Sequence, residues 1–397
     1  MKILMVTPYV PYPPSSGGQI RTMNLLKHLS QKNEITLVAL YKNQAEKKYY
    51  SYLKNYCRKI YLCQRPEKPW QFKNIAKTIF SFYPFLVIRN FSQEAATTIE
   101  TLLKREKFNV IHAETFYVMP HIPKTNVPIV LVEQTIEYNV YRHFVRSLPF
   151  YLRLLSYFDI DIIKLKYWEK YFWRKADIVV AVSHPDEAII KSEEPSLKTS
   201  VIPNGAGDEM IAASLTKKNL KRPKIFFQGN FFWLQNIEAA NYIVEKIFPL
   251  LNKKDFNIKV VIAGQNAKKI TAPHHINIKI VDIKPANVNR VRQLFAASTV
   301  FIAPIFGPGG TRLKILAAMG MGVPVVSTKT GVQGLDVVDG KHILIAQTPH
   351  QFKEMVEKML KNRRLFESIR ANAYELVKEK YQWKEIAKNL ESLYRHL

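Results

Sequence analysis

"GPGGTRLKILAAMGMGVPVVST", residues 307–328, contains the clearest indication of the fold class. It follows the apolar run "TVFIAP" and passes from a glycine turn into a helix-like segment and then into the β-branched run "VPVVST". A strand, a turn, a helix and a second buried strand in succession form the βαβ unit of a parallel sheet. The stretch therefore predicts an α/β domain, with its glycine turn at the carboxyl end of a strand, where such sheets bind ligands.

The glycine turn has the features of a phosphate-binding site. Glycines let the backbone approach a ligand, and the first amides of a helix present a partial positive charge to an anion. Arg312 can offer a fork of N–H donors and Lys314 a point charge to the same group. The residues expected to contact a diphosphate are Gly309, Gly310, Thr311, Arg312, Leu313 and Lys314. In the alternative interpretation the glycines only turn the chain and solvent covers both cations.

Strand-like and helix-like runs alternate along the rest of the chain, whose 397 residues fit two domains. A first series runs from "KILMVTPYV" to "TSVIPNG", with residues 44–59 expected as a helix, and a second begins at "KIFFQGN". Continuous apolar strands between helices indicate parallel sheets covered on both faces. We expect two doubly wound Rossmann-like domains, with the ligand in the cleft between them, since ligands bind beyond the carboxyl ends of the strands.

The domain limits follow from this alternation. The amino-terminal domain is predicted over residues 1–210 and the carboxyl-terminal domain over 211–380, with the polar segment 214–224 as the linker. Residues 381–397 are predicted to form a helix that crosses back onto the amino-terminal domain, with Trp383 and Tyr394 as anchors.

The formal net charge of +27 favours anionic surfaces or ligands. Lys and Arg alternate with aromatic residues over 42–89 and again over 141–175, a composition that can seat a helix at a lipid headgroup layer. A solvated basic face beside a core face explains the same pattern equally well, and both interpretations stay open. No zinc finger or helix-turn-helix accompanies the charge, so nucleic acid is not an expected partner.

Two further properties bear on localisation. Cys57 and Cys63 have no second pair or histidine cluster beside them and are expected as reduced thiols of a cytoplasmic protein. The apolar start "MKILMVTPYV" is expected as the first buried strand rather than as a signal peptide, and no apolar stretch is long enough to span a bilayer. We expect a cytoplasmic protein that is at most peripheral at the inner face of the membrane.

Two more glycine loops follow predicted strands. Gly17 and Gly18 lie in "PYPPSSGGQIR" before the first helix, and Gly229 and Asn230 lie in "FFQGNFFWLQN" after the first strand of the second series. Neither loop has the G-x-G-x-x-G dinucleotide pattern, and the second strand ends in "ALYKN" without an acidic residue for a ribose. A dehydrogenase is therefore disfavoured.

These segments together resemble the family-4 retaining glycosyltransferases of the GT-B type, in the branch that assembles exopolysaccharides and other cell-envelope glycans. The resemblance is carried, in order and spacing, by "VIPNG", by "FFQGNFFWLQNIEAANYIVEKIFPLL", by "IKVVIAG" and by "FIAPIFGPGGTRLKILAAMGMGVPVVSTKTGVQGL". It implies a nucleotide-sugar donor on the carboxyl-terminal domain, a glycan or lipid-linked acceptor on the amino-terminal domain, no cofactor and no obligatory metal.

The resemblance also implies roles for single residues. Gly17 and Gly18 would lie near the donor phosphate and the acceptor, and Gly229 and Asn230 near the diphosphate. Residues 309–314 would hold the phosphates, and Arg312 and Lys314 would stabilise the departing diphosphate. Glu137 lies where the branch carries an acidic residue and is the third candidate catalytic residue.

The chain departs from the family pattern at three positions. Gly309 and Ala317 occupy the places where the pattern has glutamates, and the second of those glutamates hydrogen-bonds the donor ribose. Gln134 aligns with a histidine that contacts the sugar, and a glutamine carries no proton at neutral pH.

The predicted function is transfer of a hexose, with retention, from a nucleoside diphosphate sugar to a glycan or lipid-linked acceptor. The three departures favour the main alternative, a catalytically impaired nucleotide-sugar-binding protein of the same fold. A nucleotide-sugar epimerase of the same two-domain shape is the third hypothesis.

Overall fold

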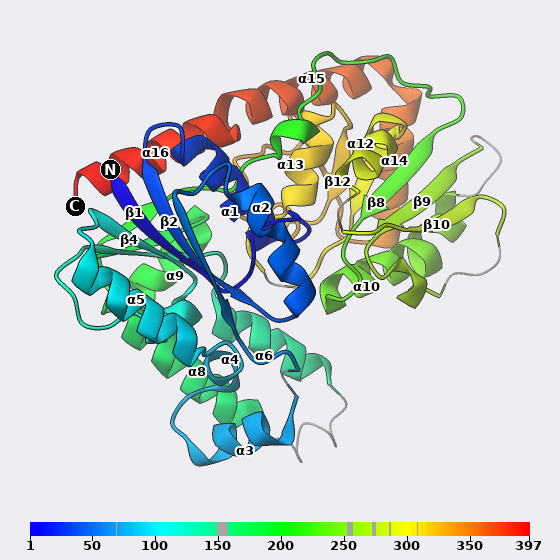
Figure 1. The fold of residues 1–397 in the computed structure, drawn as a ribbon. Coiled ribbons are helices and arrows are strands. Elements are labelled where there is room, and N and C mark those ends of the chain that lie inside the picture. The colour runs from blue at the N-terminus through cyan, green and yellow to red at the C-terminus, as the bar shows by residue number, and fades with distance from the viewer. Residues whose placement is uncertain (69, 149–157, 252–256, 272–274, 286, 308) are drawn as a thin grey trace. The chain divides into compact units, whose positions relative to one another are not determined.

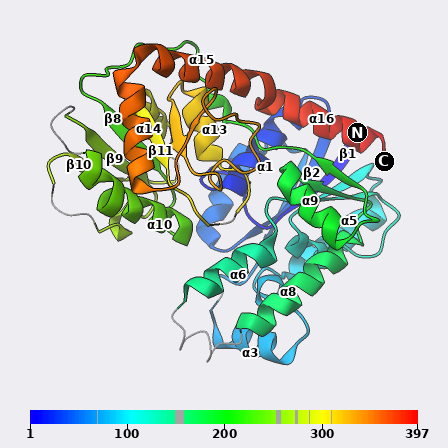
Figure 2. The ribbon, with the colours of Figure 1, turned by 180° about the vertical axis from the view of Figure 1, so that it is seen from behind.

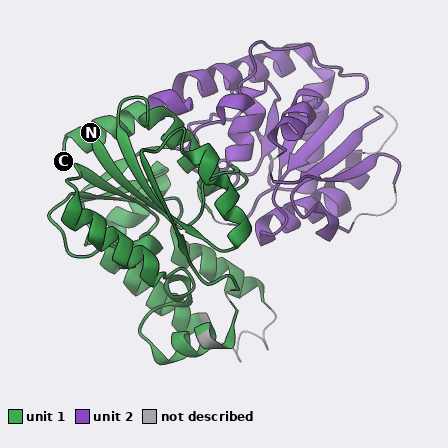
Figure 3. Ribbon diagram, viewed as in Figure 1, with its two compact units in different colours: residues 1–203, 308–310, 386–397 green, residues 204–307, 311–385 purple. Residues whose placement is uncertain are grey.

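The computed structural model describes residues 1–68, 70–148, 158–251, 257–271, 275–285, 287–307 and 309–397. The chain divides into two compact units, shown in Figure 3. Unit 1 comprises residues 1–203, 308–310 and 386–397, and unit 2 comprises residues 204–307 and 311–385. We expected the first boundary at 210/211, and the segment 214–224, expected as the linker, is part of unit 2.

Unit 1 is built on a seven-stranded sheet in the order β3-β2-β1-β4-β5-β6-β7, in which all neighbours are parallel (Figure 1). Its strands are β1 (Lys2–Thr7), β2 (Glu34–Tyr41), β3 (Lys59–Gln64), β4 (Val110–Glu114), β5 (Ile129–Glu133), β6 (Ile178–Ala181) and β7 (Thr199–Val201). The chain order reverses between β1 and β4, and the carboxyl ends of strands beside such a switch point are the expected ligand site.

Helices cover this sheet; α5 packs on β2 and β3, and α9 packs on β6 and β7. In the described residues of unit 1 the α-helices are α1 (Gly17–Leu29), α2 (Tyr50–Leu53), α3 (Phe72–Phe80), α4 (Phe85–Ile88), α5 (Gln93–Arg105), α6 (Glu137–Ser147), α8 (Phe158–Trp173) and α9 (His184–Glu193). Helix α16 (Trp383–Arg395) begins in unit 2 and ends in unit 1.

The prediction of a single helix over residues 44–59 is wrong. The chain forms a 3-10 helix at Gln44–Tyr49 and the short α2, and then enters β3 at Lys59. Strand β3 is the edge of the sheet, and its first four residues are only half-buried. An edge strand therefore lacks the continuous apolar run that identified the central strands in the sequence.

Unit 2 has a six-stranded parallel sheet in the order β10-β9-β8-β11-β12-β13. Its strands are β8 (Lys224–Gln228), β9 (Lys259–Gly264), β10 (Ile278–Asp282), β11 (Val300–Ala303), β12 (Val325–Ser327) and β13 (Leu344–Ile345). Its α-helices are α10 (Leu234–Tyr242), α11 (Phe248–Leu251), α12 (Val288–Ala296), α13 (Leu313–Gly320), α14 (Pro349–Lys361) and α15 (Arg363–Lys380). Figure 2 shows α14 against this sheet, where it contacts β12 and β13.

These two parallel α/β units confirm the predicted fold class. The end of α16 lies in unit 1, where the Tyr394 hydroxyl lies 2.5 Å from Nδ1 of His112 on β4. Cys57 and Cys63 are buried free thiols, as expected. Across the described ranges, no helix is both long enough and apolar enough to span a bilayer.

Candidate functional site

The loop after β8 is fixed closely against the end of β9. The amide of Gly229 donates to the carbonyl of Ala263 at 3.1 Å, and the amide of Phe231 donates to the carbonyl of Gln265 at 2.9 Å. Gly264 has a φ of +147°, and a Cβ there would lie 1.8 Å from the carbonyl oxygen of Gly229. Only glycine fits this crossing, which sets the position of the Gly229 loop.

The side chain of Asn230 organises the same loop. Its Oδ1 accepts hydrogen bonds from the amide of Phe232 and from Nδ2 of Asn266, both at 3.0 Å. Its carbonyl accepts a 2.8 Å hydrogen bond from Nδ2 of Asn236, in the first turn of α10. The Asn230 side chain is thus engaged by the protein, and a ligand would meet the backbone of this loop.

The two predicted phosphate cations lie together at the start of α13. Arg312 is the N-cap residue of this helix, which has no side-chain cap, and its Nη2 donates to the carbonyl of Gly307 at 2.7 Å. Nζ of Lys314 donates to Oδ1 of Asn236 at 2.5 Å and lies 4.8 Å from the centre of the Phe227 ring. Lys314 therefore joins the first turn of α13 to the first turn of α10, another helix without a side-chain cap.

The electrostatics at Lys314 favour an anion. Burial of the ammonium group, with added repulsion from Arg312, lowers the pKa of Lys314 to about 7. Two helix N-termini also contribute partial positive charge at this point. A diphosphate here would relieve the repulsion and accept hydrogen bonds from groups that are already in place.

Gly309 and Gly310 fall on the other side of the unit boundary. Both group with unit 1, whereas residues 311–314 belong to unit 2. The six residues predicted to contact the diphosphate are therefore divided between the units. Gly309 has a φ of +147°, which a side chain at this position would strain. A Cβ on Gly310 would lie 2.1 Å from the carbonyl oxygen of Gln134, another unit 1 residue. The first departure from the family pattern thus occupies a position whose backbone suits glycine.

The glycine pair of unit 1 begins α1. Ser16 is the N-cap residue, and its hydroxyl accepts from the amide of Gln19. Gly17 is exposed, whereas a Cβ on Gly18 would lie 2.5 Å from the Tyr9 hydroxyl and 2.8 Å from Oε1 of Gln134. Gly18 thereby lies beside Gln134, the residue that replaces the expected histidine.

Gln134, the residue after β5, ends a largely buried polar network that links it to strand β4 and to helices α1 and α16. Its Nε2 donates to Oε1 of Glu114 at 2.6 Å, and Nε of Arg21 lies 3.4 Å from the same oxygen. Oε2 of Glu114 lies 2.6 Å from Nε2 of His112, whose Nδ1 faces Tyr394. Burial alone would raise the pKa of Glu114, but the hydrogen bond and charge of His112 and the charge of Arg21 hold that pKa below its ordinary value. The carboxylate is therefore kept charged, and His112 has a protein partner at each nitrogen.

Glu137 belongs to unit 1, at the start of α6, whereas Arg312 and Lys314 belong to unit 2. Its amide donates to Oε1 of Glu169 at 2.8 Å. Burial raises the pKa of Glu137 to about 7, although the charge of Arg89 opposes this shift. A carboxyl group with such a pKa can orient or deprotonate a hydroxyl near neutral pH.

Ala317 is buried within α13 with 9% of its surface exposed. Its methyl group has no hydrogen-bonding capacity, so the ribose contact that the family pattern supplies from this position is missing.

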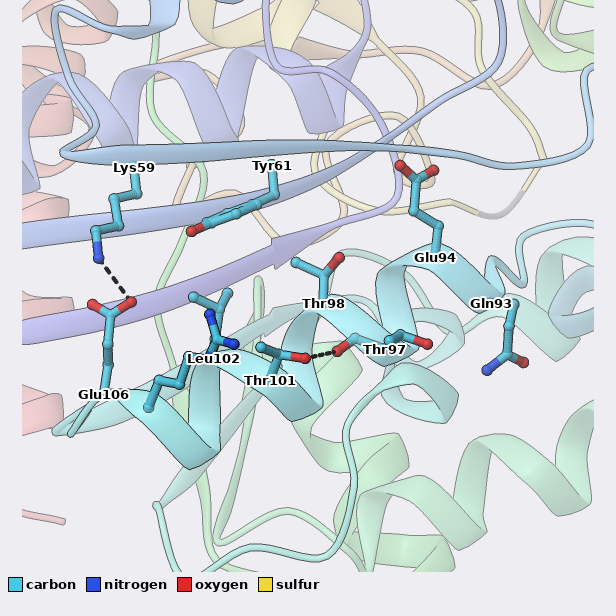
Figure 4. A pocket seen from close by; sticks show the side chains of 10 residues that line it. Lys59, Tyr61, Gln93, Glu94, Thr97, Thr98, Thr101, Leu102 and Glu106 are labelled. Atoms are coloured by element: carbon cyan, nitrogen blue, oxygen red, sulfur yellow. Dashed lines mark hydrogen bonds and ion pairs between the residues drawn. The ribbon is translucent and has the colours of Figure 1, made fainter.

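A separate hollow of about 650 Å³ lies between β3 and α5 (Figure 4). Three of its charged groups are engaged within the protein, because Lys59 pairs with Glu106 at 2.8 Å and Glu94 accepts from the amide of Gln64 at 2.8 Å. We assign this hollow no role in the reaction.

Comparisons with known proteins agree with the fold described above. The family model described as "Glycosyltransferase Family 4" matches residues 15–209, and the model described as "Glycosyl transferases group 1" matches residues 222–362. The chain is a glycosyltransferase, similar to family 4 and with the GT-B fold, and hence a transferase enzyme.

Two bacterial relatives in sequence are named for a cps region and for a diphosphoundecaprenol-linked substrate. A 44.6 kDa protein of the cps region of Klebsiella pneumoniae is 22% identical, over 97% of each chain. The UDP-Gal:alpha-D-GlcNAc-diphosphoundecaprenol alpha-1,3-galactosyltransferase of Escherichia coli is 24% identical, over 63% of this chain and 66% of the relative.

Solved structures share the fold at lower identity. Sucrose-phosphate synthase of Thermosynechococcus elongatus has a TM-score of 0.71 and 13% identity, over 100% of this chain and 98% of the other. Anabaena Alr3699/HepE, solved in complex with UDP, has a TM-score of 0.65 and 14% identity, over 100% of both chains.

Asn236, Gly264 and Arg21 also shape the site and were not predicted from the sequence. Asn236 stands six residues after Asn230, at the expected helix start, and this was the available signal for a polar group facing the loop. Gly264 ends an expected strand, where a glycine often marks close approach of another backbone. Arg21 left no comparable signal, because its partner Glu114 is 93 positions away in the sequence.

Proposed function

We propose that this glycosyltransferase transfers a hexose, with retention of configuration, from a nucleoside diphosphate sugar to a lipid-linked glycan of the cell envelope. The observation that carries the proposal is the Lys314 ammonium, held 2.5 Å from Asn236 between two uncapped helix N-termini and beside Arg312. The Anabaena protein was solved with UDP and with UDP-glucose, and the Escherichia coli relative is named for a UDP-galactose donor and a diphosphoundecaprenol-linked acceptor.

In the proposed reaction the bond between the sugar anomeric carbon and the donor diphosphate breaks. The acceptor hydroxyl forms its bond to that carbon on the same face, and its proton passes to the departing diphosphate. Arg312 and Lys314 stabilise the negative charge that develops on the diphosphate. The reaction needs no cofactor and no obligatory metal, since these two cations and the helix N-termini supply the positive charge. Glu137 orients the acceptor hydroxyl from unit 1.

Calorimetric titration with UDP tests the donor site. Lys314→Met and Arg312→Met are each expected to weaken binding about tenfold or more, because each removes a charge-assisted hydrogen bond to phosphate. Lys358→Met, which removes an exposed lysine of α14 in the same unit, is the matched control and should bind UDP like the unchanged protein. Equal affinity for UDP in the unchanged protein and all three variants would refute the proposed diphosphate site.

Retention is tested separately with a UDP-hexose and a diphosphate-linked acceptor. Nuclear magnetic resonance of the product should show the same anomeric configuration as the donor. An inverted product would rule out the proposed mechanism while leaving the donor site intact.

The impaired binding protein is the second candidate, and it is favoured by Ala317 of α13, whose methyl group offers no hydrogen-bond acceptor. In that case UDP-hexoses bind without transfer or hydrolysis, and Ala317→Glu restores turnover by supplying a ribose acceptor. Turnover by the unchanged protein excludes this candidate. Conversion of the donor sugar without any acceptor would instead reveal an epimerase.

We further propose that unit 1 attaches peripherally to an anionic membrane. Phe72, Phe80 and Phe82 around helix α3 are 86%, 89% and 87% exposed. Nε1 of Trp168 donates to the carbonyl of Phe82 at 2.7 Å and so ties this surface to α8. A hollow of about 400 Å³ beside α8 is lined by Arg142, Lys166, Lys170, Arg174, Ile162, Ile163 and Tyr167. Inserted phenylalanines with cations facing lipid phosphates are the expected arrangement.

Flotation with phosphatidylglycerol vesicles at low salt tests the attachment. The protein is expected to float with the vesicles, and Phe72→Ser with Phe80→Ser is expected to leave it largely in the soluble fraction. Ile276→Ser is the matched control, since Ile276 is 95% exposed but belongs to unit 2. Failure of the unchanged protein to float would overturn this proposal.

A further inference from the structure

A cluster of three cations lies at the carboxyl edge of the unit 1 sheet. Lys42 follows β2 and Arg65 follows β3, and the preceding residues Tyr41 and Gln64 are register partners in these neighbouring parallel strands. Arg65 Nη1 donates a hydrogen bond to Oδ1 of Asn90, the residue after Arg89. The topology thus brings three separate segments of positive charge to the edge where such sheets bind ligands.

The structure leaves these cations without acidic partners. Within the ranges that it describes, none of Lys42, Arg65 and Arg89 forms an ion pair, and the buried Nε atoms of both arginines have no hydrogen-bond acceptor. The nearby carboxylate of Glu46 is engaged elsewhere, since its Oε1 accepts from the amides of Lys42 and Asn43 at 3.3 and 3.1 Å. Unpaired buried donors and adjacent like charges are both unfavourable, so a site with this composition is suited to an anion.

The three charges influence one another. Partial desolvation, with repulsion from Arg65 and Arg89, lowers the pKa of Lys42 to about 8. Burial lowers the pKa of Arg65 to about 10, and repulsion from Arg89 adds to this shift. The charges of Tyr117 and Glu46 oppose it. A bound dianion would reverse both effects.

Glu137 and Tyr117 belong to the same neighbourhood. The charge of Arg89 acts on both of them, and Arg65 also acts on Tyr117. Arg89 therefore lies within electrostatic range of the candidate catalytic carboxyl group of unit 1, which is consistent with an anion attached to the acceptor sugar.

An apolar surface leads away from the cluster. The Arg89 guanidinium lies 5.9 Å from the centre of the Phe85 ring, and Phe85 stacks on Trp70 at 4.7 Å. Trp70 is 59% exposed, and α4, which contains Phe85, packs on α3 with its exposed phenylalanines. A ligand with an anionic group and an apolar chain would therefore meet a matching surface on both sides of Phe85.

We propose that Lys42, Arg65 and Arg89 bind the diphosphate that joins the acceptor glycan to its polyprenyl carrier. Two guanidinium forks and an ammonium match the several oxygens of a diphosphate, whereas a single carboxylate would leave most of these donors unfilled. The inference rests on the proposed function only in taking the acceptor to be lipid-linked. It assigns this diphosphate to unit 1, separate from the donor diphosphate at Lys314 in unit 2.

Binding of farnesyl diphosphate to the full-length protein tests the assignment. The unchanged protein is expected to bind it at least about tenfold more tightly than farnesol, and Arg65→Met and Arg89→Met are each expected to weaken it about tenfold. Arg58→Met is the matched control, because Arg58 is an exposed arginine at the opposite end of β3. Thermal melts verify folding, and Lys42→Met supplies a variant at an exposed position if either arginine variant fails to fold.

Further ligands separate the possible sources of the anion. UDP should bind Arg65→Met and Arg89→Met normally, and Lys314→Met should lose UDP while keeping farnesyl diphosphate. Folded cluster variants that bind farnesyl diphosphate like the unchanged protein would overturn the inference, as would equal binding of farnesol. Displacement by glucuronate but not by inorganic pyrophosphate would also overturn it, because the cluster would then recognise a charged sugar. If the unchanged protein binds farnesyl diphosphate but not UDP, only the proposed donor site is refuted.

Discussion

Lys314 combines a structural contact with a titration near neutral pH. Its ammonium donates to Asn236 and lies against the Phe227 ring, and burial followed by repulsion from Arg312 lowers its pKa to about 7. The buried ammonium group lowers the stability of the free protein. It favours binding of a diphosphate, because the diphosphate stabilises its protonated form.

Donor binding is expected to depend on pH through Lys314. Below pH 7 the free protein already carries the proton, and above pH 7 binding must take one up. Affinity for UDP should therefore fall with rising pH, by up to about tenfold per unit, until the raised pKa of the complex is reached. Titrations between pH 6.5 and 9 measure this slope. Lys314→Arg keeps its charge over this range, so a slope that persists in that variant would contradict the assignment.

Glu133 is expected to reduce the stability of unit 1 at neutral pH. Burial, with added repulsion from Glu169, raises its pKa well above the ordinary value. The unfolded chain then releases a proton that the folded chain retains, so stability is lost as pH rises from about 4.5 toward the folded pKa. Glu133→Gln should raise the free energy of unfolding by about 1–3 kcal/mol at pH 8, and by less at pH 5. Glu354→Gln, at an exposed position of α14, should show no such difference in denaturant unfolding.

At the scale of elements, the donor site depends on how the ends of β8 and β9 pass each other. The carbonyl of Gly229 occupies the space that a Cβ on Gly264 would need, so the Gly229 loop packs directly on the Gly264 backbone. The sequence spacing of the glycines identified the loop but not this crossing.

Gly264→Ala is expected to destabilise unit 2 by about 3 kcal/mol or more, because it adds overlap with the Gly229 carbonyl to an unfavourable φ. Gly340→Ala is the matched control, since Gly340 has a φ of +76° and open space around its Cβ position. The control should cost only about 1 kcal/mol. Denaturant unfolding measures both, and equal costs would mean that the crossing is not tight.

At the scale of the whole molecule, the last helix returns to the first sheet. Tyr394 of α16 and His112 of β4 are 282 positions apart and meet at 2.5 Å in a fully buried contact. His112 in turn contacts Glu114, so the end of the chain supports the network beside Gly18.

Tyr394→Phe is expected to lower the free energy of unfolding by about 1–2 kcal/mol, since it leaves a buried histidine nitrogen without its partner. Tyr50→Phe, at an exposed tyrosine, should change it by less than about 0.5 kcal/mol. Thermal and denaturant unfolding measure both, and indistinguishable variants would show that the contact does not hold α16.

Much of the fold could be predicted from local patterns. Residues 34–41 and 110–114 form strands with the predicted bounds, and the glycine turns follow strands as expected. Strand β3 could not be predicted in the same way, because an edge strand is buried on too little of its surface to have a continuous apolar run. The candidate site was predictable in its glycines and in Arg312 and Lys314, because these residues are close together in the sequence.

Local sequence patterns specify the alternation of strands and helices, the glycine turns and the position of two cations at one helix start. The contacts of Lys314 with Asn236 and of Arg21 with Glu114, and the edge that Lys42 and Arg65 share with Arg89, arise only in the folded chain. The two kinds of information differ in their range along the chain. Periodicity and turn chemistry act between neighbours in the chain, whereas burial, pKa shifts and ion pairing depend on which distant residues the fold brings together.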